Sequence, residues 1–330
     1  MKAIKILTMA ALATAVFASC SSEDELAQNN YPMDNVVRIM TSVDGMNTRA
    51  SYENSTDKLS SFGFCINNAK STTYTYDNIK VTKDDNNNWN PATQMLWQNS
   101  TAAVDILAYA PYQETTEDAS GKVKVFGKTD YAFSVQPDQS DAENYLSDLI
   151  VYKQTGFTPG KELNTNQAVN VAFTHLLSQL NLTIELRDQF NQNGKTVTAT
   201  TVTDVKVNGT IISSKVDFSA SPISVQVDGT QAAAITPETT GFTPAENTTN
   251  QHAVFNYSAI VIPQTVAAGN FSISFKVNNT EYIWTATDAV TFESGKKHEL
   301  HLLVGKDVVQ GGAISAKPWG DETITEKETD

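Results

Sequence analysis

The spacing of the hydrophobic residues after residue 35 constrains the fold more than any other feature of the chain. These residues alternate with polar ones or come in short blocks, and long helical periodicity is scarce. Residues 270–287 show the alternation in two successive segments, which predicts a β-hairpin. One face of its first strand would carry Phe271, Ile273, Phe275 and Val277, the turn would be Asn278 and Asn279, and the return strand would carry Tyr282 and Trp284.

Other segments follow the same pattern. Residues 104–112 would place Val104, Ile106 and Ala108 on one face and Leu107 and Tyr109 on the other. Asn-Gly or Asp-Gly pairs, which favour turns, occur at residues 193–194, 208–209 and 228–229. Short strands with frequent turns predict an all-β protein built from β-sandwiches. We expect less than roughly 10% helix, compared with about a third in an average globular protein.

Residues 173–186 combine two periodicities. Their first half has helical spacing and their second half has strand spacing, so we expect a short helical turn or a bulge that leads into a strand. Turn-forming residues dominate residues 152–168, which favours a domain boundary there. We therefore expect one sandwich at residues 35–160 and a second at residues 165–330, the latter ending in a terminal strand and a tail.

Residues 1–19 have the features of a lipoprotein signal peptide. Lys2 and Lys5 precede an apolar run that is too short to span a bilayer comfortably, and small residues precede Cys20. This segment looks like a bacterial lipobox, although Phe17 is larger than the usual Leu. We expect cleavage before Cys20 and lipid, including palmitate, on that cysteine, which would anchor the chain firmly. Residues 20–34 would form an acidic tether, and their serine and acidic run resembles the export tag of surface lipoproteins in anaerobic Gram-negative bacteria.

Composition and motifs argue against several classes of function. The net charge of −14 argues against nucleic acid binding. With Cys20 lipidated, Cys65 has no partner for a disulfide, and thiolate zinc sites are excluded. His298 and His301 lie three residues apart on an expected strand, so they would point to opposite faces and could not chelate a metal together. Residues 84–88 lack the spacing of an EF-hand loop and predict a hairpin tip.

No catalytic arrangement stands out in the chain. There is no nucleophile with a base, no acid pair and no phosphate-binding loop. We therefore expect no enzyme activity, no metal and no cofactor.

Several segments, taken in order, resemble one family. They are residues 89–112, 147–152, 171–186, 259–275 and 292–304, and together with the lipobox they are similar to the fimbrillin-like proteins, the subunits of type V pili and their relatives. The resemblance covers nearly the whole chain after Cys20. It implies two tandem transthyretin-like β-sandwich domains and a precursor anchored in the outer membrane at the cell surface. It also implies cleavage by an Arg-specific surface protease and polymerisation with other pilin subunits through donated strands.

Arg49 matches the cleavage position that the resemblance implies, and Ala50 would become the new first residue. Polar and small neighbours favour an exposed loop at this position. The preceding residues 35–43 predict a strand with Val37, Ile39 and Val43 on one face. Losing that strand would open a hydrophobic groove with unpaired backbone groups, which a strand of another chain could fill. The alternative is that Arg49 is an ordinary surface charge and the protein stays anchored.

The expected donor strand lies within residues 308–319, with Ala313, Ile314 and Trp319 as its apolar residues. The tail beyond Gly320 alternates poorly, because Ile324 is its only large apolar residue. An accessory or terminal pilus subunit is therefore an alternative, and so is a non-polymerising surface adhesin or glycan-binding lipoprotein. The receptor is not indicated. Two residues of the family-like segments also have a physical interpretation of their own. A single histidine among hydrophobic residues is rarely a ligand, so we expect His175 in the core or at an interface, and Gly295 fits a turn with positive φ.

Overall fold

The computed structural model describes residues 30–43, 58–114, 124–141, 144–191, 196–245 and 252–319. In this part of the chain, strands account for 53% of the residues and helices for 4%, which confirms the all-β prediction. The helices are single turns, namely η1 (Asn144–Ser147), α1 (Pro159–Glu162) and η2 (Asp188–Phe190). Within these ranges, no helix is long and apolar enough to cross a membrane.

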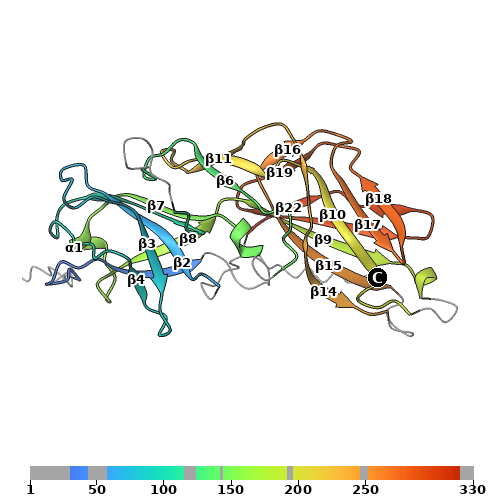
Figure 1. Ribbon diagram of the computed structural model, residues 1–330, viewed down its shortest axis with the longest axis horizontal. Helices are drawn as coiled ribbons and strands as arrows, with labels where there is room; N and C mark the ends of the chain where they lie inside the picture. The colour runs from blue at the N-terminus through green and yellow to red at the C-terminus, as the bar shows by residue number, and fades with distance from the viewer. Residues whose placement is uncertain are drawn as a thin grey trace, which may run out of the picture.

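One half of the elongated molecule is built on a seven-stranded sheet (Figure 1). In spatial order its strands are β1 (Arg38–Val43), β8 (Ala168–His175), β7 (Ile150–Phe157), β5 (Val104–Ala110), β2 (Ser61–Asn67), β3 (Tyr76–Lys83) and β4 (Trp89–Pro91). β1 and β4 are therefore the two edges of this sheet.

The central strands of this sheet are buried on both faces. In β5, Ile106 and Ala108 belong to one hydrophobic cluster, whereas Leu107 and Tyr109 belong to the other. This division confirms the two faces predicted for residues 104–112. Continuous burial explains why the strand reads as an apolar run instead of a strict alternation.

The other half of the molecule contains sheets packed in a sandwich-like arrangement (Figure 1). One sheet consists of β14 (Glu238–Thr243), β15 (Ala253–Val261), β9 (Ser178–Leu186), β20 (Lys296–Val304) and β21 (Val309–Gly311), and β22 (Ser315–Pro318) also pairs with β20. A second sheet consists of β13 (Ala233–Ile235), β10 (Val202–Thr210), β17 (Ser272–Val277) and β18 (Thr280–Thr285). Smaller sheets are formed by β12 (Ser224–Val227), β11 (Ser213–Asp217) and β6 (Tyr131–Ser134), and by β16 (Gln264–Val266) and β19 (Val290–Phe292).

The hairpin predicted at residues 270–287 is confirmed as β17 and β18. Its turn residues Asn278 and Asn279 have φ angles of 48° and 70°, and Val277 pairs with Thr280. Asparagine tolerates this left-handed backbone better than most residues, so the two asparagines favour the turn.

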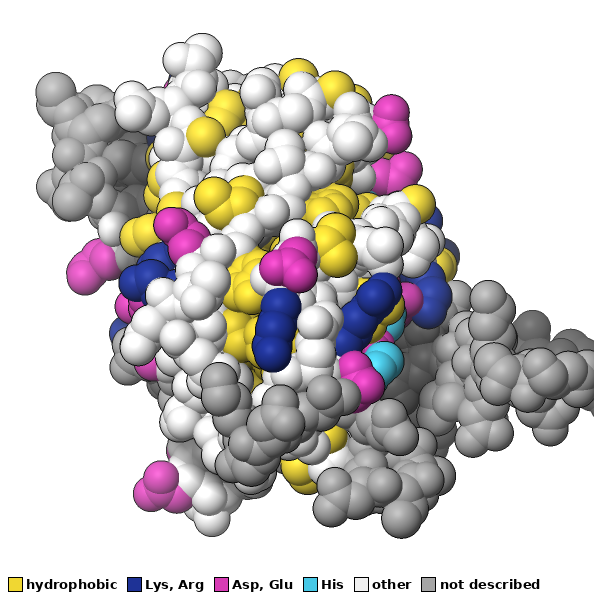
Figure 2. All heavy atoms as spheres, turned by 90° about the vertical axis from the view of Figure 1, so that its right-hand side faces the viewer, with side chains coloured by type: hydrophobic (Ala, Val, Ile, Leu, Met, Phe, Trp, Pro, Cys, Tyr) yellow, Lys and Arg dark blue, Asp and Glu magenta, His cyan; other side chains and the backbone are white. Residues whose placement is uncertain are grey.

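β17 and β18 lie toward the right-hand side of Figure 1, which is the side that faces the viewer in Figure 2. Hydrophobic side chains gather there, and side chains of both charges interrupt them. Two exposed hydrophobic residues of this half are Ile283 of β18, which is 58% exposed, and Val308. β18 is an edge strand and carries the exposed Glu281, and charged side chains on an edge strand are a common protection against edge-to-edge association.

Of the helical turn or bulge expected near residue 173, the helical turn is wrong, whereas the strand expected after it is confirmed as β9. Phe173 lies in β8, and the chain bends at Leu176 and Leu177 before β9 begins. Phe173 packs in the cluster of the first sheet, whereas Leu177 and Leu180 pack in the cluster of the sandwich. The apparent helical spacing arises because the chain passes from one hydrophobic core to the next.

Hydrogen bonds between segments distant in the sequence join the seven-stranded sheet to the small sheet of β6, β11 and β12. Within that small sheet, β6 pairs with β11, with Phe133 opposite Ser214. The Nζ of Lys153 in β7 donates to the backbone carbonyls of Phe218, Ser219 and Ala220 at 2.8, 2.9 and 2.8 Å. The domain boundary at residues 152–168 stays a prediction. These residues belong to β7, to α1 and to the turn that leads into β8.

Candidate assembly site

β1 lies at one edge of the seven-stranded sheet and is attached mainly through one side. It runs parallel to β8, from Arg38 opposite Ala168 to Val43 opposite Phe173. On its other side, the structure shows only a short antiparallel bridge just before the strand, where Val36 lies opposite Leu96. The strand predicted at residues 35–43 is thus present, and it is peripheral.

β1 nevertheless contributes to the hydrophobic core. Val37 and Ile39 are 2% and 6% exposed and belong to the same buried cluster as Phe62, Trp97 and Phe173. These two residues confirm the inward face expected for this segment, whereas the side chain of Val43 lies outside the described residues. Removal of β1 from the sheet would therefore expose part of the hydrophobic core of this half.

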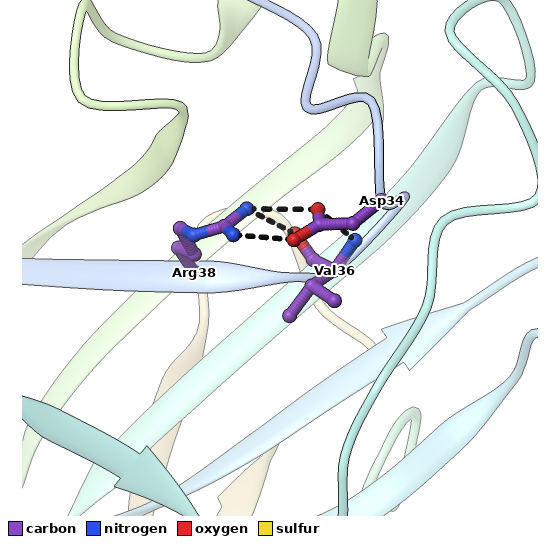
Figure 3. Close-up of polar contacts among 3 residues, drawn as sticks. All are labelled: Asp34, Val36 and Arg38. Atoms are coloured by element: carbon purple, nitrogen blue, oxygen red, sulfur yellow. Dashed lines mark hydrogen bonds and ion pairs between the residues drawn. The ribbon is translucent and has the colours of Figure 1, made fainter.

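An ion pair fixes the backbone where the chain enters β1 (Figure 3). The Nη2 of Arg38 lies 2.6 Å from Oδ2 of Asp34, and its Nη1 donates to Oδ1 at 3.1 Å. The same Oδ1 accepts the backbone N–H of Val36 at 3.1 Å. These bonds hold the pKa of the Asp34 carboxyl below its usual value, and the hydrogen bond from Arg38 contributes most to this shift. The clamp sets the direction of the chain at the start of the strand.

The C-terminal strand is the second peripheral element. β22 pairs antiparallel with β20, with His298 opposite Ala316, and most of its residues are exposed. Of the expected donor residues, Ala313 is exposed, whereas Ile314 and Trp319 are partly buried against the sandwich core. In this structure the expected donor residues therefore lie on the chain's own second half.

Trp319 is seated on a buried polar pair. Its ring stacks on His175, with centroids 4.0 Å apart and planes 4° from parallel. The Nδ1 of His175 contacts Oδ2 of Asp148 at 2.9 Å, and the two side chains are 2% and 0% exposed. Within the described residues, the Nε2 of His175 has no hydrogen-bond partner. His175 is thus a core histidine, as its hydrophobic neighbours in the sequence predict, and it contacts the end of the C-terminal strand.

Nearby contacts complete this seat. The backbone N–H of Trp319 donates to the carbonyl of Gly295 at 3.1 Å. Gly295 has φ +66°, which confirms the turn conformation expected for it. Lys317 on β22 forms an ion pair with Glu299 on β20 at 2.9 Å.

The two histidines that lie three residues apart, His298 and His301, also have definite positions. His298 is buried, whereas the side chain of His301 is 57% exposed, so the two face opposite ways as predicted. Burial lowers the pKa of His298, and its Nε2 accepts the N–H of Glu293. The residues that the structure describes contain no cluster of three or more His, Cys, Asp or Glu side chains able to hold a metal ion.

The predicted hairpin tip at residues 84–88 joins β3 to β4. Its Asp84 accepts hydrogen bonds from the backbone N–H groups of Asn86 and Asn88, and from the side-chain amides of Asn88 and Asn90. The carboxylate therefore stabilises the turn.

The other predicted site residues, Cys20, Arg49 and Ala50, lie outside the described residues. The ends of the two peripheral segments contact the same strand, because Val43 pairs with Phe173 of β8 and Trp319 stacks on His175, two residues further along β8. Asp148 is the residue that sequence reasoning missed. It lies within one of the family-like segments, but no pattern in the sequence connects it to His175.

The fold and the site define an all-β protein in two halves, with a peripheral strand near each end. A fimbrillin-like family model matches residues 48–319, and the chain therefore belongs to the fimbrillin-like family.

Solved structures share this fold at low sequence identity. A candidate cell adhesion protein from Bacteroides ovatus is 12% identical with a TM-score of 0.60, and the match covers 86% of this chain and 97% of that one. A candidate cell adhesion protein from Bacteroides uniformis is 18% identical with a TM-score of 0.56, covering 87% and 99%. A fimbrial protein from Bacteroides vulgatus is 16% identical with a TM-score of 0.51, covering 86% and 99%. The comparison with curated proteins gave no match.

Proposed function

We propose that this chain is a structural subunit of a cell-surface pilus that supports adhesion. The match to the fimbrillin-like family over residues 48–319 carries the proposal. The peripheral positions of β1 and β22 support it, because each strand could leave the sheet without breaking its central strands. The names of two structural neighbours, cell adhesion protein and fimbrial protein, agree with this role.

The precursor would be an outer-membrane lipoprotein exposed at the cell surface. Lipid on Cys20 would hold it there until an Arg-specific protease cuts after Arg49. The segment that carries β1 could then leave with the anchor, and the uncovered side of β8 would accept a strand from another subunit. The donor would be the C-terminal strand around Ala313, Ile314 and Trp319, after its release from β20.

Unboiled extracts of surface material test whether the protein polymerises. We expect a ladder of SDS-resistant species that collapses to one band on boiling, because strand-exchanged subunits share backbone hydrogen bonds and a buried core. The boiled half of each sample is the control. A single band in both halves would favour a non-polymerising surface adhesin.

Replacing Cys20 by serine tests the anchor separately. The variant should lose all labelling by radioactive palmitate and should appear in the soluble fraction, because no thiol remains at residue 20 to carry the acyl chain. Replacing Cys65 by serine is the matched control. That thiol is buried beside Asp77, and burial raises its pKa, so its loss should not change labelling. Undiminished labelling of the Cys20→Ser chain would end the lipoprotein proposal.

A further inference from the structure

A groove lies between the two edge strands of the first sheet. It has a volume of about 770 Å³ and runs between residues 36–41 of the β1 segment and the hairpin of β3 and β4. The antiparallel bridge between Val36 and Leu96 crosses between the two sides. This volume lies within the roughly 300–1,000 Å³ typical of small-ligand sites. Because residues 36–41 form one side of it, this groove belongs to the uncut chain, before the proposed strand exchange would remove β1.

The lining of the groove differs from the rest of this acidic chain. None of its lining residues is an aspartate or a glutamate, although the chain has a net charge of −14. Side-chain amides are frequent instead, and they come from Asn87, Asn88, Asn90, Gln94 and Asn166. An amide both donates and accepts hydrogen bonds, as a sugar hydroxyl does, so this lining suits a ligand rich in hydroxyl groups.

Several of these polar groups are available to a ligand. Among the described residues, the side chains of Asn87 and Gln94 form no hydrogen bond. The Oγ1 of Thr41, which also lines the groove, is buried without a partner in this part of the chain. Buried polar groups usually have a partner, so an unfilled one in a groove points to something that binds there.

Other amides in the groove are held in place. Asn88 and Asn90 each donate their Nδ2 to Oδ2 of Asp84, at 3.2 and 3.1 Å. This contact leaves the amide oxygens of both residues as oriented acceptors. Groups already fixed before binding lose less conformational entropy when a ligand arrives.

The two cations in the lining are already engaged. Arg38 forms its ion pair with Asp34, and the Nζ of Lys83 lies 5.4 Å from the ring centre of Trp89. The partly exposed indole of Trp89 adds apolar surface, which can contact the C–H faces of a sugar ring. Little free charge remains to select an anion.

We propose that this groove binds a neutral oligosaccharide. The amides and the Thr41 hydroxyl would contact the sugar hydroxyls, and Trp89 would contact a ring face. An extended peptide is the competing ligand. The backbone N–H of Val37 donates to the carbonyl of Met95, and every second N–H along a strand points to the same side. The N–H groups of Ile39 and Thr41 therefore point toward the groove, where a peptide could accept from them. However, β4 has three residues and ends at Pro91, which has no N–H, so a peptide could form few ladder bonds there.

A glycan array probed with the full-length, detergent-solubilised chain tests this proposal. The array would carry neutral, sialylated and sulfated oligosaccharides, and the hexapeptide (Thr-Val)₃ would be added as a competitor. The test variant combines Gln94→Ala with Asn87→Gly, since glycine accepts the φ of +63° at residue 87. We expect binding to neutral oligosaccharides, weakened about tenfold or more in this variant.

The matched control is Gln226→Ala, which removes an exposed amide from β12, away from the groove, and should leave binding unchanged. Equal thermal unfolding of the three proteins would show that the variants remain folded. Three results would overturn the proposal: no binding to neutral oligosaccharides, a preference for sialylated or sulfated ones, or equal binding by the double variant. Displacement of bound sugar by (Thr-Val)₃, or binding of the peptide alone, would instead identify a site for extended peptides.

Discussion

Cells that produce the Arg49→Ala chain should carry a folded, lipidated precursor that forms no fibres. In the uncut chain, β1 is tethered to its own sheet, so its effective concentration there is on the order of millimolar. Val37 and Ile39 also bury most of their side chains, which contributes about 3–6 kcal/mol before the cost of ordering the strand. A strand from another subunit would have to displace this attached strand. We therefore expect SDS-resistant ladders to disappear and precursor to accumulate.

The small number of arginines makes this experiment specific. The chain has three, at positions 38, 49 and 187. Arg38 lies in β1 and is bound to Asp34, and Arg187 donates its backbone N–H to Val304 at 3.0 Å and its Nη2 to Gln310 at 2.7 Å. Proteases prefer exposed segments without such bonds, so these two positions should resist cleavage. An Arg-specific protease should give one new amino terminus, at Ala50.

Arg187→Ala is the matched control, because it removes an arginine while leaving the proposed cleavage position intact. It should polymerise like the unchanged chain. Fibres made only of chains that begin at Cys20 would exclude gating by cleavage. If the Arg49→Ala chain polymerises as well as the unchanged chain, Arg49 is only a surface charge. A new amino terminus at Ile39 would show that the protease cuts after Arg38, within β1.

Local patterns in the sequence predicted the strands well where burial followed a simple rule. The hairpin of β17 and β18 was predictable because one face is buried and asparagines fix the turn. The two faces of β5 were predictable for the same reason, because neighbouring side chains point to opposite sides. The prediction failed near residue 173, where consecutive hydrophobic residues serve two different cores.

Contacts between distant residues could not be predicted from one sequence. The side-chain amide of Gln139 exchanges two hydrogen bonds with the backbone of Ile260, at 3.0 and 2.7 Å, and Gln264 does the same with Ile211, both at 2.9 Å. Each of these amides forms the two backbone hydrogen bonds that a neighbouring strand would otherwise form. In the sequence, such a glutamine cannot be distinguished from one on the surface. Asp148 illustrates the same limit, since its position 27 residues before His175 follows no helical or strand period.

His175→Ala should have the largest effect on stability among single substitutions in the site. The imidazole donates to the carboxylate of Asp148, and neither side chain has more than 2% exposure. Removing it deprives a buried carboxylate of a hydrogen bond and leaves Trp319 over a cavity. We expect the free energy of unfolding to fall by about 3 kcal/mol, measured by urea denaturation.

The chain contains a matched control for this change. His301 contacts Oε2 of Glu185 at 2.7 Å, but its side chain is 57% exposed, so His301→Ala should cost less than about 1 kcal/mol. Equal losses for the two histidines would contradict the role assigned to burial.

Trp319→Ala separates the C-terminal strand from the polar pair beneath it. It removes the stacked ring but keeps the bond between His175 and Asp148, so we expect a smaller loss of about 1–2 kcal/mol. Limited proteolysis should then cut the end of the chain faster, because the segment loses its stacked ring and keeps the backbone bonds to β20 and Gly295 and the exposed ion pair of Lys317. If the double variant His175→Ala with Trp319→Ala loses as much stability as the two single variants combined, the ring and the imidazole do not act together. A smaller loss would show that Trp319 depends on His175, so that the buried pair holds the expected donor strand until assembly.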